Sequence, residues 1–412
     1  LFGVGRGISK VIEYFKDKGA PAAAAEATEQ VLKEVGADPA KINPNVYSAI
    51  QQEVGDALRA DVKPDPKVML NRADAASLPV PMNLTRGMAS RDSPLYSWEQ
   101  NTSKLRGGGE PLNDRLVELN RNAIENLNVF GAKNAPSTFD ASQKLIQHIE
   151  GVDAAAKEQV DAAYNLVRDS AGRTAKVSNE EFATLAKNHL TEGRPEMAEL
   201  TSLADYLPEP IVKQYNAIIN GKLPLTVDVV QFLDRNWNGI QRGASDATVK
   251  KSIGALRKAL NDAPVSDSLG ETAMQAYKQA RQLAAQRFSA IESNPAYKAV
   301  SEGVEPDKFF QKYVQGANVS ELAGLKKLVG ADNTAMLQQT LIGNLKKTAL
   351  NRASDDNGVF SQAAYNKILQ DPVQAPRLKE LFADNPQTLE QLYRLGRVAE
   401  NIADAYKALE ER

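Results

Sequence analysis

The chain has 412 residues, of which 42% are apolar, 6% aromatic and 25% charged, and it has no cysteine. Fifty Lys and Arg against 52 Asp and Glu give a formal net charge of −2, which argues against a dedicated nucleic-acid binder with a basic stripe. The missing cysteine excludes disulfides, thiolate metal sites and cysteine nucleophiles. No run approaches the ~20 apolar residues that span a bilayer, so we expect no membrane-spanning helix in this chain.

The first expected helix covers residues 8–15, where apolar side chains recur at helical spacing. Residues 1–7 carry alternating glycines and no starting Met, which we interpret as a packed, frayed or processed end. A remnant of a targeting or membrane-touching segment is the alternative. An alanine-rich helix over residues 20–35 and an amphipathic helix over 46–58 follow.

Prolines are frequent in the next stretch, and residues 63–82 are interpreted as a Pro-rich linker around a short helix. The glycine trio 107–109 ends one helix, and Glu110-Pro111 begins a longer one that reaches about Phe130. Together these two helices predict a small helical hairpin.

The middle of the chain shows helical periodicity with short interruptions. Residues 138–149 and 154–170 are expected to form an antiparallel pair. Ser178 and Glu181 match a capping box, in which each side chain satisfies a free backbone N–H of the other residue. Further helices are expected over 179–190, 195–205, 208–219, 227–237, 246–260 and 269–293.

The last third predicts helices over 306–314, 320–329, 333–349, 361–369, 375–382 and 386–409. The final one is interpreted as an ordinary amphipathic helix, with a short coiled-coil seam as the alternative. No long alternating run of β-branched residues occurs, so the sequence predicts an all-α, elongated protein made of several helical hairpins or bundles. The predicted divisions are an N-terminal unit 1–62, the linker 63–82, and helical units 83–205, 206–300 and 301–412.

The sequence offers few groups for chemistry. His148 and His189 are far apart and form no HExxH pair, and the P-loop and GxSxG patterns are absent. Residues 355–358 superficially match a calcium loop, but the twelfth position is Asn366 where a bidentate Glu is required. We therefore predict no catalytic, cofactor-binding or metal-binding residue and no cofactor.

Glu99 is the one carboxylate with suggestive neighbours, because it follows Trp98 and precedes the glycine trio. A catalytic Glu would be expected in a helical cell-wall hydrolase. No second carboxylate is placed by the sequence to act with it, so we favour a structural role for Glu99.

Two basic groupings could line up on helix faces. One joins Lys346-Lys347 with Arg352, and the other joins Arg281 with Arg287. We favour ordinary solvated surface for both.

Two stretches carry a family resemblance. The first runs from Leu84-Thr85-Arg86-Gly87 through Trp98-Glu99-Gln100-Asn101 to Gly108-Gly109-Glu110-Pro111-Leu112, and the second covers residues 304–313. They resemble segments of internal virion or DNA-ejection proteins of short-tailed bacteriophages. Residues 360–367 and 395–399 extend the resemblance, which covers most of residues 80–400 loosely. These segments contain no catalytic motif.

The resemblance implies a non-enzymatic protein that is packed in the virion and expelled ahead of the genome. It implies a homo-oligomeric conduit for genome delivery, located in the virion and, after infection, in the host cell envelope or periplasm. Expected partners are other portal, tail or ejection proteins, with transient contact to genome DNA and the envelope. A static portal, tail or capsid-associated protein is the alternative, followed by a virion-associated cell-wall hydrolase and by a monomeric adaptor.

Overall fold

The computed structural model describes residues 20–34, 36–91, 93–103, 105, 107–169, 172–194, 202–351 and 356–402. Across these ranges the chain is all-α, which confirms the predicted fold class. Two isolated β-bridges, Lys176 to Thr226 and Val177 to Val265, add to the helices. No helix in the described ranges is long and apolar enough to cross a membrane. The expected helix over residues 8–15 lies outside them.

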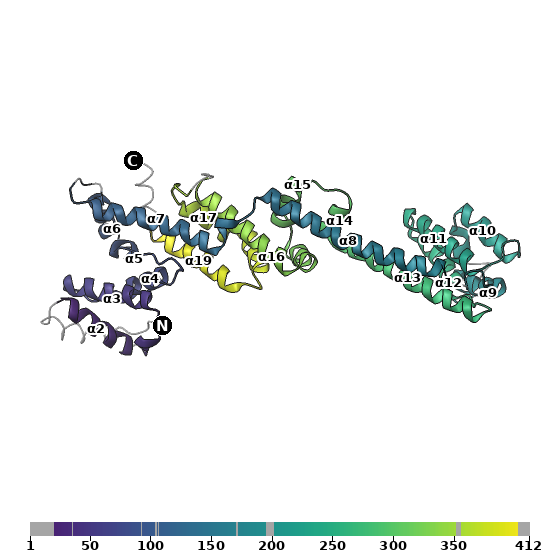
Figure 1. Ribbon diagram of the computed structural model, residues 1–412, viewed down its shortest axis with the longest axis horizontal. Helices are drawn as coiled ribbons and strands as arrows, with labels where there is room; N and C mark the ends of the chain where they lie inside the picture. Colours follow the sequence, from purple (N-terminus) through teal and green to yellow (C-terminus); the bar gives the residue numbers. More distant parts are fainter. Residues whose placement is uncertain are drawn as a thin grey trace. The chain divides into compact units, whose positions relative to one another are not determined.

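The chain divides into two compact units, and Figure 1 labels helices of both. Unit 1 comprises Leu1–Ile149 and Asn294–Arg412, and unit 2 comprises Glu150–Ser293. These boundaries differ from the five predicted divisions. Unit 1 is built from two segments that are far apart in sequence. Local sequence patterns do not show that two such segments pack together.

The N-terminal segment of unit 1 contains α2 (Ala20–Glu34), η1 (Pro39–Lys41), α3 (Pro44–Arg59), α4 (Pro66–Ala76), α5 (Arg86–Ser90), α6 (Ser93–Ser103), α7 (Glu110–Phe130) and η2 (Ala132–Asn134). Its C-terminal segment contains α14 (Pro295–Ser301), α15 (Pro306–Phe310), the π-helical turn η5 (Gln311–Gln315), α16 (Val319–Ala349), α17 (Gln362–Leu369), α18 (Gln374–Leu381) and α19 (Pro386–Glu400). The two segments pack together, since α19 contacts α4 and α7. An ion pair of 2.8 Å between Arg394 and Asp74 joins α19 to α4.

The expected Pro-rich linker is part of this packing. Helix α4 lies within it and buries Val68 and Met69, while Pro64 is also buried. The prolines lie at helix starts and in loops, where a missing backbone N–H costs little free energy. They are therefore compatible with a packed segment and do not indicate a flexible linker. This stretch is therefore a structural part of unit 1.

Unit 2 contains α9 (Asn179–Leu190), η4 (Leu203–Tyr206), α10 (Glu209–Ile219), α11 (Val227–Gly243), α12 (Ala247–Asp262) and α13 (Ser268–Ser293). Its core gathers apolar side chains from all the α-helices of this set, with Phe182 and Trp237 as large, fully buried members. The indole N–H of Trp237 donates to Gln214 Oε1 at 2.6 Å, which satisfies its polar atom. The core of unit 2 is thus mostly aliphatic, with a few buried aromatic rings, and the polar atom of Trp237 is hydrogen-bonded.

Helix α8 (Thr138–Arg168) corrects one expectation. It runs unbroken through residues 150–153, where a turn between two antiparallel helices was predicted. Gly151 lowers helix propensity by only about 1 kcal/mol, and the long flanking helical stretches outweigh it. The predicted break near residue 330 is confirmed, because Gly330 adopts φ 80° and ψ 178° and divides α16 into two arms.

Only one of the two hydrogen bonds of the predicted Ser178 capping box is present in the structure. Ser178 Oγ accepts the backbone N–H of Glu181 at 3.2 Å. The backbone N–H of Ser178 donates instead to the carbonyl of Pro264 at 3.0 Å, next to the short bridge between Val177 and Val265. A complete capping box occurs at Asn318 and Glu321, at the start of α16.

Candidate functional site

Glu99 and Trp98 lie on different faces of α6. Glu99 is 9% exposed and Trp98 is 62% exposed. Successive residues of a helix differ by about 100° in direction, so the sequence neighbours point apart. The indole therefore does not supply an apolar wall to the carboxylate.

The Glu99 carboxylate is held by α5. It accepts hydrogen bonds from Thr85 Oγ1 at 2.5 Å and from the Gly87 backbone N–H at 2.9 Å. Thr85 is also the N-cap of α5, where its hydroxyl accepts the N–H of Met88 at 3.2 Å. Glu99 thus satisfies donors at a helix start that would otherwise lose their partners on burial.

Gly87 makes this arrangement possible. A methyl group at residue 87 would lie 2.6 Å from Oε2 of Glu99, well inside van der Waals contact. Residues 84–87 and 98–101 therefore meet in a close contact that requires glycine.

A second buried carboxylate lies nearby, on α3. Glu53 has a fully buried side chain, and its Oε1 accepts the backbone N–H of Asp65 at 3.1 Å. Arg72 lies 3.4 Å from its Oε2, and Arg86 lies 3.3 Å from its Oε1. Arg72 also donates to the carbonyl of Leu84 at 3.2 Å, so the network ties α3 and α4 to the start of α5.

Both carboxylates have raised pKa values. Burial raises the pKa of Glu99, against the opposing effect of the hydrogen bonds from Thr85 and Gly87. Burial likewise raises the pKa of Glu53, and the Asp65 N–H and the two arginines oppose the rise. A raised pKa suits a general acid, but both oxygens of each carboxylate already accept hydrogen bonds or ion pairs from the protein. The geometry is that of an internal joint between helices.

The histidines do not form a site. His148 is exposed on α8, whereas Nε2 of His189 on α9 lies 3.9 Å from Asp262. Within the described ranges, no cluster of three or more His, Asp or Glu side chains is arranged to hold a metal ion.

The structure places the described residues of the two basic groupings in separate ion pairs. Lys346 pairs with Asp356 and donates to Asn128 Oδ1 at 2.7 Å, while Arg352 lies outside the described residues. Arg287 pairs with Asp153 at 2.8 Å, and Arg281 pairs with Asp234 at 2.9 Å.

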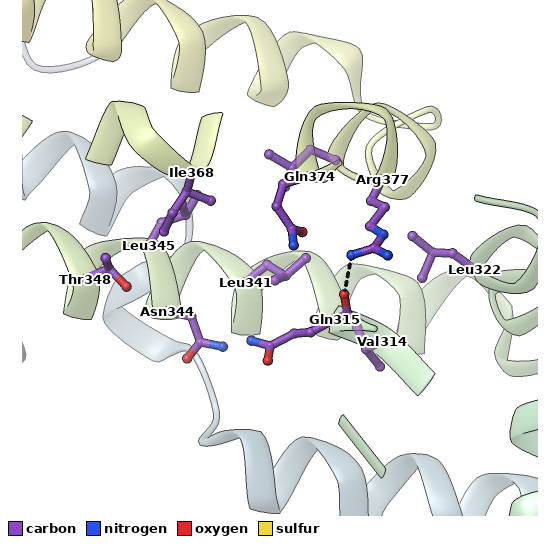
Figure 2. Close-up of a pocket in the computed structure, with 11 residues that line it drawn as sticks. Val314, Gln315, Leu322, Leu341, Asn344, Leu345, Thr348, Ile368, Gln374 and Arg377 are labelled. Carbon is purple, nitrogen blue, oxygen red and sulfur yellow. Dashed lines mark hydrogen bonds between the residues drawn. The ribbon is translucent and has the colours of Figure 1, made fainter. Parts of the chain in front are cut away.

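A pocket of about 280 Å³ lies in unit 1 between η5, α16, α17 and α18, and Figure 2 shows its lining. Leu322, Leu341, Leu345, Ile368 and Leu378 give it apolar walls. The polar lining consists of carboxamides, one hydroxyl and one guanidinium, from Gln315, Asn344, Gln374, Thr348 and Arg377.

The charged group of this pocket is already engaged. Arg377 donates to the carbonyl of Gln315 at 2.7 Å, the dashed line in Figure 2, and to that of Gly316 at 3.3 Å. These bonds satisfy carbonyls at the end of the π-helical turn. Figure 2 shows the carboxamides of Gln315 and Asn344 pointing toward one another, and Gln374 reaching from α18 toward Leu341. The lining contains no Asp, Glu, His or Lys, so it can hold a small neutral molecule but offers no acid or base.

None of these lining residues carries a signal of a binding site in the sequence. They come from short stretches spread over residues 314–378, and each looks like an ordinary core or surface position of its own helix. The π-helical turn is a local irregularity of the lining, and such turns occur often at functional sites.

No protein-family model, curated protein or solved structure matches this chain.

Proposed function

We propose that this chain is a non-enzymatic bacteriophage structural protein, of the internal virion or ejection type, that oligomerises into a conduit for genome delivery across the host envelope. Its partners are further copies of itself and other virion proteins. It resides in the virion and, after infection, in the host cell envelope or periplasm.

The observation that carries the proposal is where the resembling segments lie in the fold. Residues 84–87 and 98–101 meet at the Glu99 joint described above. Glu110, from the end of the first resembling stretch, accepts the N–H of Gly107 at 2.8 Å and closes the turn into α7. These residues fix helix packing, as expected for motifs shared by structural proteins.

The C-terminal resembling segments form a second joint. The side-chain amide of Asn366 donates to the carbonyl of Gly396 at 3.0 Å. A methyl group at residue 396 would lie closer than a normal contact to Asn366 Oδ1, so α17 and α19 approach where one of them has no side chain. Phe360 and Tyr365 are fully buried beside this contact, with ring centroids 5.3 Å apart. Again the resembling residues serve packing.

Self-assembly is tested by mass photometry and negative-stain imaging of the purified protein, with and without lipid or detergent. We expect a discrete ring or tube of several copies. A monomer under every condition would remove self-assembly as an intrinsic property and favour an adaptor or assembly on another virion component.

Ejection is tested by fractionating infected cells and probing for the chain. An ejected protein appears in the envelope or periplasmic fraction, whereas a static portal, tail or capsid component stays with the empty particle. The hydrolase alternative requires that the purified protein cleaves peptidoglycan and that Glu99→Gln abolishes the cleavage. We expect no cleavage by the unmodified protein.

A further inference from the structure

A second pocket, in unit 2, has an unusual charge. Its volume is about 500 Å³, and α8, α11, α12 and α13 supply its lining. Five cationic side chains line it: Arg235, Arg242, Arg257, Lys278 and Arg281. Asp234 is the one carboxylate in that lining.

Helical periodicity explains how the cations converge. On α11, Asp234, Asn238 and Arg242 lie at steps of four residues and share one face, and Arg235 is three residues before Asn238 and borders that face. Lys278 and Arg281 on α13 are three residues apart and share a face in the same way.

Asp234 organises two of the cations. Its side chain is 3% exposed, and it lies 2.9 Å from Arg257 Nε and 2.9 Å from Arg281 Nη1. Burial alone would raise the pKa of Asp234, but the hydrogen bonds and charges of the two guanidinium groups outweigh it and hold the pKa below its ordinary value. The carboxylate is therefore ionised at neutral pH and neutralises one charge.

Neutral side chains also hold Arg257 and Arg281 in place. Arg257 Nη1 also donates to Asn238 Oδ1 at 3.0 Å and to Gln241 Oε1 at 2.7 Å. Asn261 donates to Asp234 at 3.1 Å and accepts from Arg281 Nη1 at 2.5 Å. Arg257 is thus nearly saturated and acts as part of the wall, whereas Arg281 is fixed in place with Nε and Nη2 left without a hydrogen bond inside the described part of the chain.

The other three cations, Arg235, Arg242 and Lys278, are not held in ion pairs among the residues that the structure describes. Arg235 and Lys278 have no ion pair or side-chain hydrogen bond among the described residues, and Arg242 lies over the Phe288 ring, 4.2 Å from its centroid. The lining therefore carries four positive charges in excess. Gathering like charges around a concave site is unfavourable unless an anion fills it, and a guanidinium with two free donors suits phosphate oxygens.

We propose that this pocket binds a small compound bearing a di- or triphosphate group, with Arg235, Lys278 and Arg281 as the side chains that contact the phosphates. A triphosphate chain carries about as much negative charge as the lining has in excess, and the volume lies within the range usual for small-molecule sites. A nucleic-acid duplex is too wide to enter such a pocket. The inference goes beyond the proposed function and does not depend on it.

The test is calorimetric titration of the full chain with sodium tripolyphosphate, and separately with ATP. The test variant is Arg235→Gln/Lys278→Gln, because both side chains are exposed and, within the described part of the chain, form no ion pair or side-chain hydrogen bond. The control variant is Lys187→Gln/Lys213→Gln, which removes the same charge from exposed positions of unit 2 outside the pocket. Circular dichroism verifies that both variants fold.

We expect tripolyphosphate to bind, the test variant to weaken binding at least about tenfold, and the control to change it less than about twofold. Tighter binding of ATP than of tripolyphosphate would assign a nucleotide as the source of the phosphates, and the reverse order would assign a free polyphosphate. No binding at millimolar ligand, or an equal loss in the control variant, would overturn the proposal. So would binding of a single-stranded oligonucleotide that tripolyphosphate cannot displace.

Discussion

Gly87 and Glu99 show how much a single residue position can constrain this fold. The Gly87→Ala change would bring a methyl group 2.6 Å from the Glu99 carboxylate, which is itself buried and fixed by two hydrogen bonds. We expect a loss of about 1–3 kcal/mol in the free energy of unfolding, measured by urea denaturation. In a Glu99→Ala background the obstructing carboxylate is gone, so the same change should cost clearly less.

A matched control separates this clash from a general effect of adding a methyl group. Gly108 has open space around its Cβ position, so Gly108→Ala should leave the free energy of unfolding nearly unchanged. If Gly87→Ala costs the same with and without the Glu99 side chain, the close approach is not the cause.

The buried Glu99 carboxyl also makes stability depend on pH. Its pKa is raised on folding, so the folded state binds the proton more tightly than the unfolded state. Its contribution is therefore most favourable below the ordinary pKa of 4.5 and declines as pH rises through the raised value. Glu99→Gln removes this titration.

We expect the free energy of unfolding of the unmodified protein, minus that of Glu99→Gln, to fall over the pH interval that starts near the ordinary pKa of 4.5 and extends upward. Denaturation curves of both proteins at several pH values measure it. A difference that stays constant or grows over that interval would show that burial does not raise this pKa.

Among the helices, what the sequence predicts well is local. Periodicity together with Gly and Pro placed the ends of α7, α13 and α16 within a few residues. The continuity of α8 was missed because a single glycine looks the same in a turn and inside a helix. The second half of the predicted Ser178 capping box does not form, because a tertiary hydrogen bond to the Pro264 carbonyl takes the Ser178 N–H.

The sites were harder to predict than the helices, for a physical reason. Arg281 was singled out, but its pairing with Asp234 on α11 and the free Arg235 and Lys278 beside it depend on how four helices pack. A solvated arginine and an arginine fixed in a pocket have the same local sequence pattern. For Glu99 the sequence favours a structural role, but its partners Thr85 and Gly87 are 12 to 14 residues away and came only from the structure.

Gly151 and Gly330 offer a matched test of helix backbone. Neither has any atom close to its Cβ position, so an added methyl group meets open space at both. Gly151 is inside the regular helix α8, and Gly151→Ala should stabilise it by up to about 1 kcal/mol. Gly330 has φ 80° and ψ 178°, a conformation nearly closed to other residues, so Gly330→Ala should destabilise by about 1–3 kcal/mol.

Thermal unfolding followed by circular dichroism at 222 nm measures both effects. The expected result is a higher midpoint for Gly151→Ala and a lower one for Gly330→Ala. A rise for both would mean that α16 is a straight helix without the break at residue 330, and a fall for Gly151→Ala would restore the predicted turn there.

At the scale of the whole molecule, each unit has its own buried core. In unit 2, Trp237 is fully buried and its N–H donates to Gln214. In unit 1, Tyr365 is fully buried and its hydroxyl donates to the carbonyl of Leu392 at 3.0 Å. A hydrophobic core is what makes a unit unfold cooperatively, so the two units should unfold in separable steps.

Calorimetry of the full chain with one aromatic substitution in each core tests this independence. Trp237→Phe leaves a void and an unpaired Gln214 carbonyl, and should lower only the transition of unit 2, by an amount equivalent to about 2–4 kcal/mol. Tyr365→Phe removes the buried hydroxyl that donates to the Leu392 carbonyl, and should lower only the transition of unit 1, by about 1–3 kcal/mol. Tyr206→Phe, at a residue 53% exposed, is the surface control and should move neither. If both core variants shift one common transition equally, the two units unfold as one cooperative unit. Neither unit could then unfold and refold separately while the protein assembles into an oligomer.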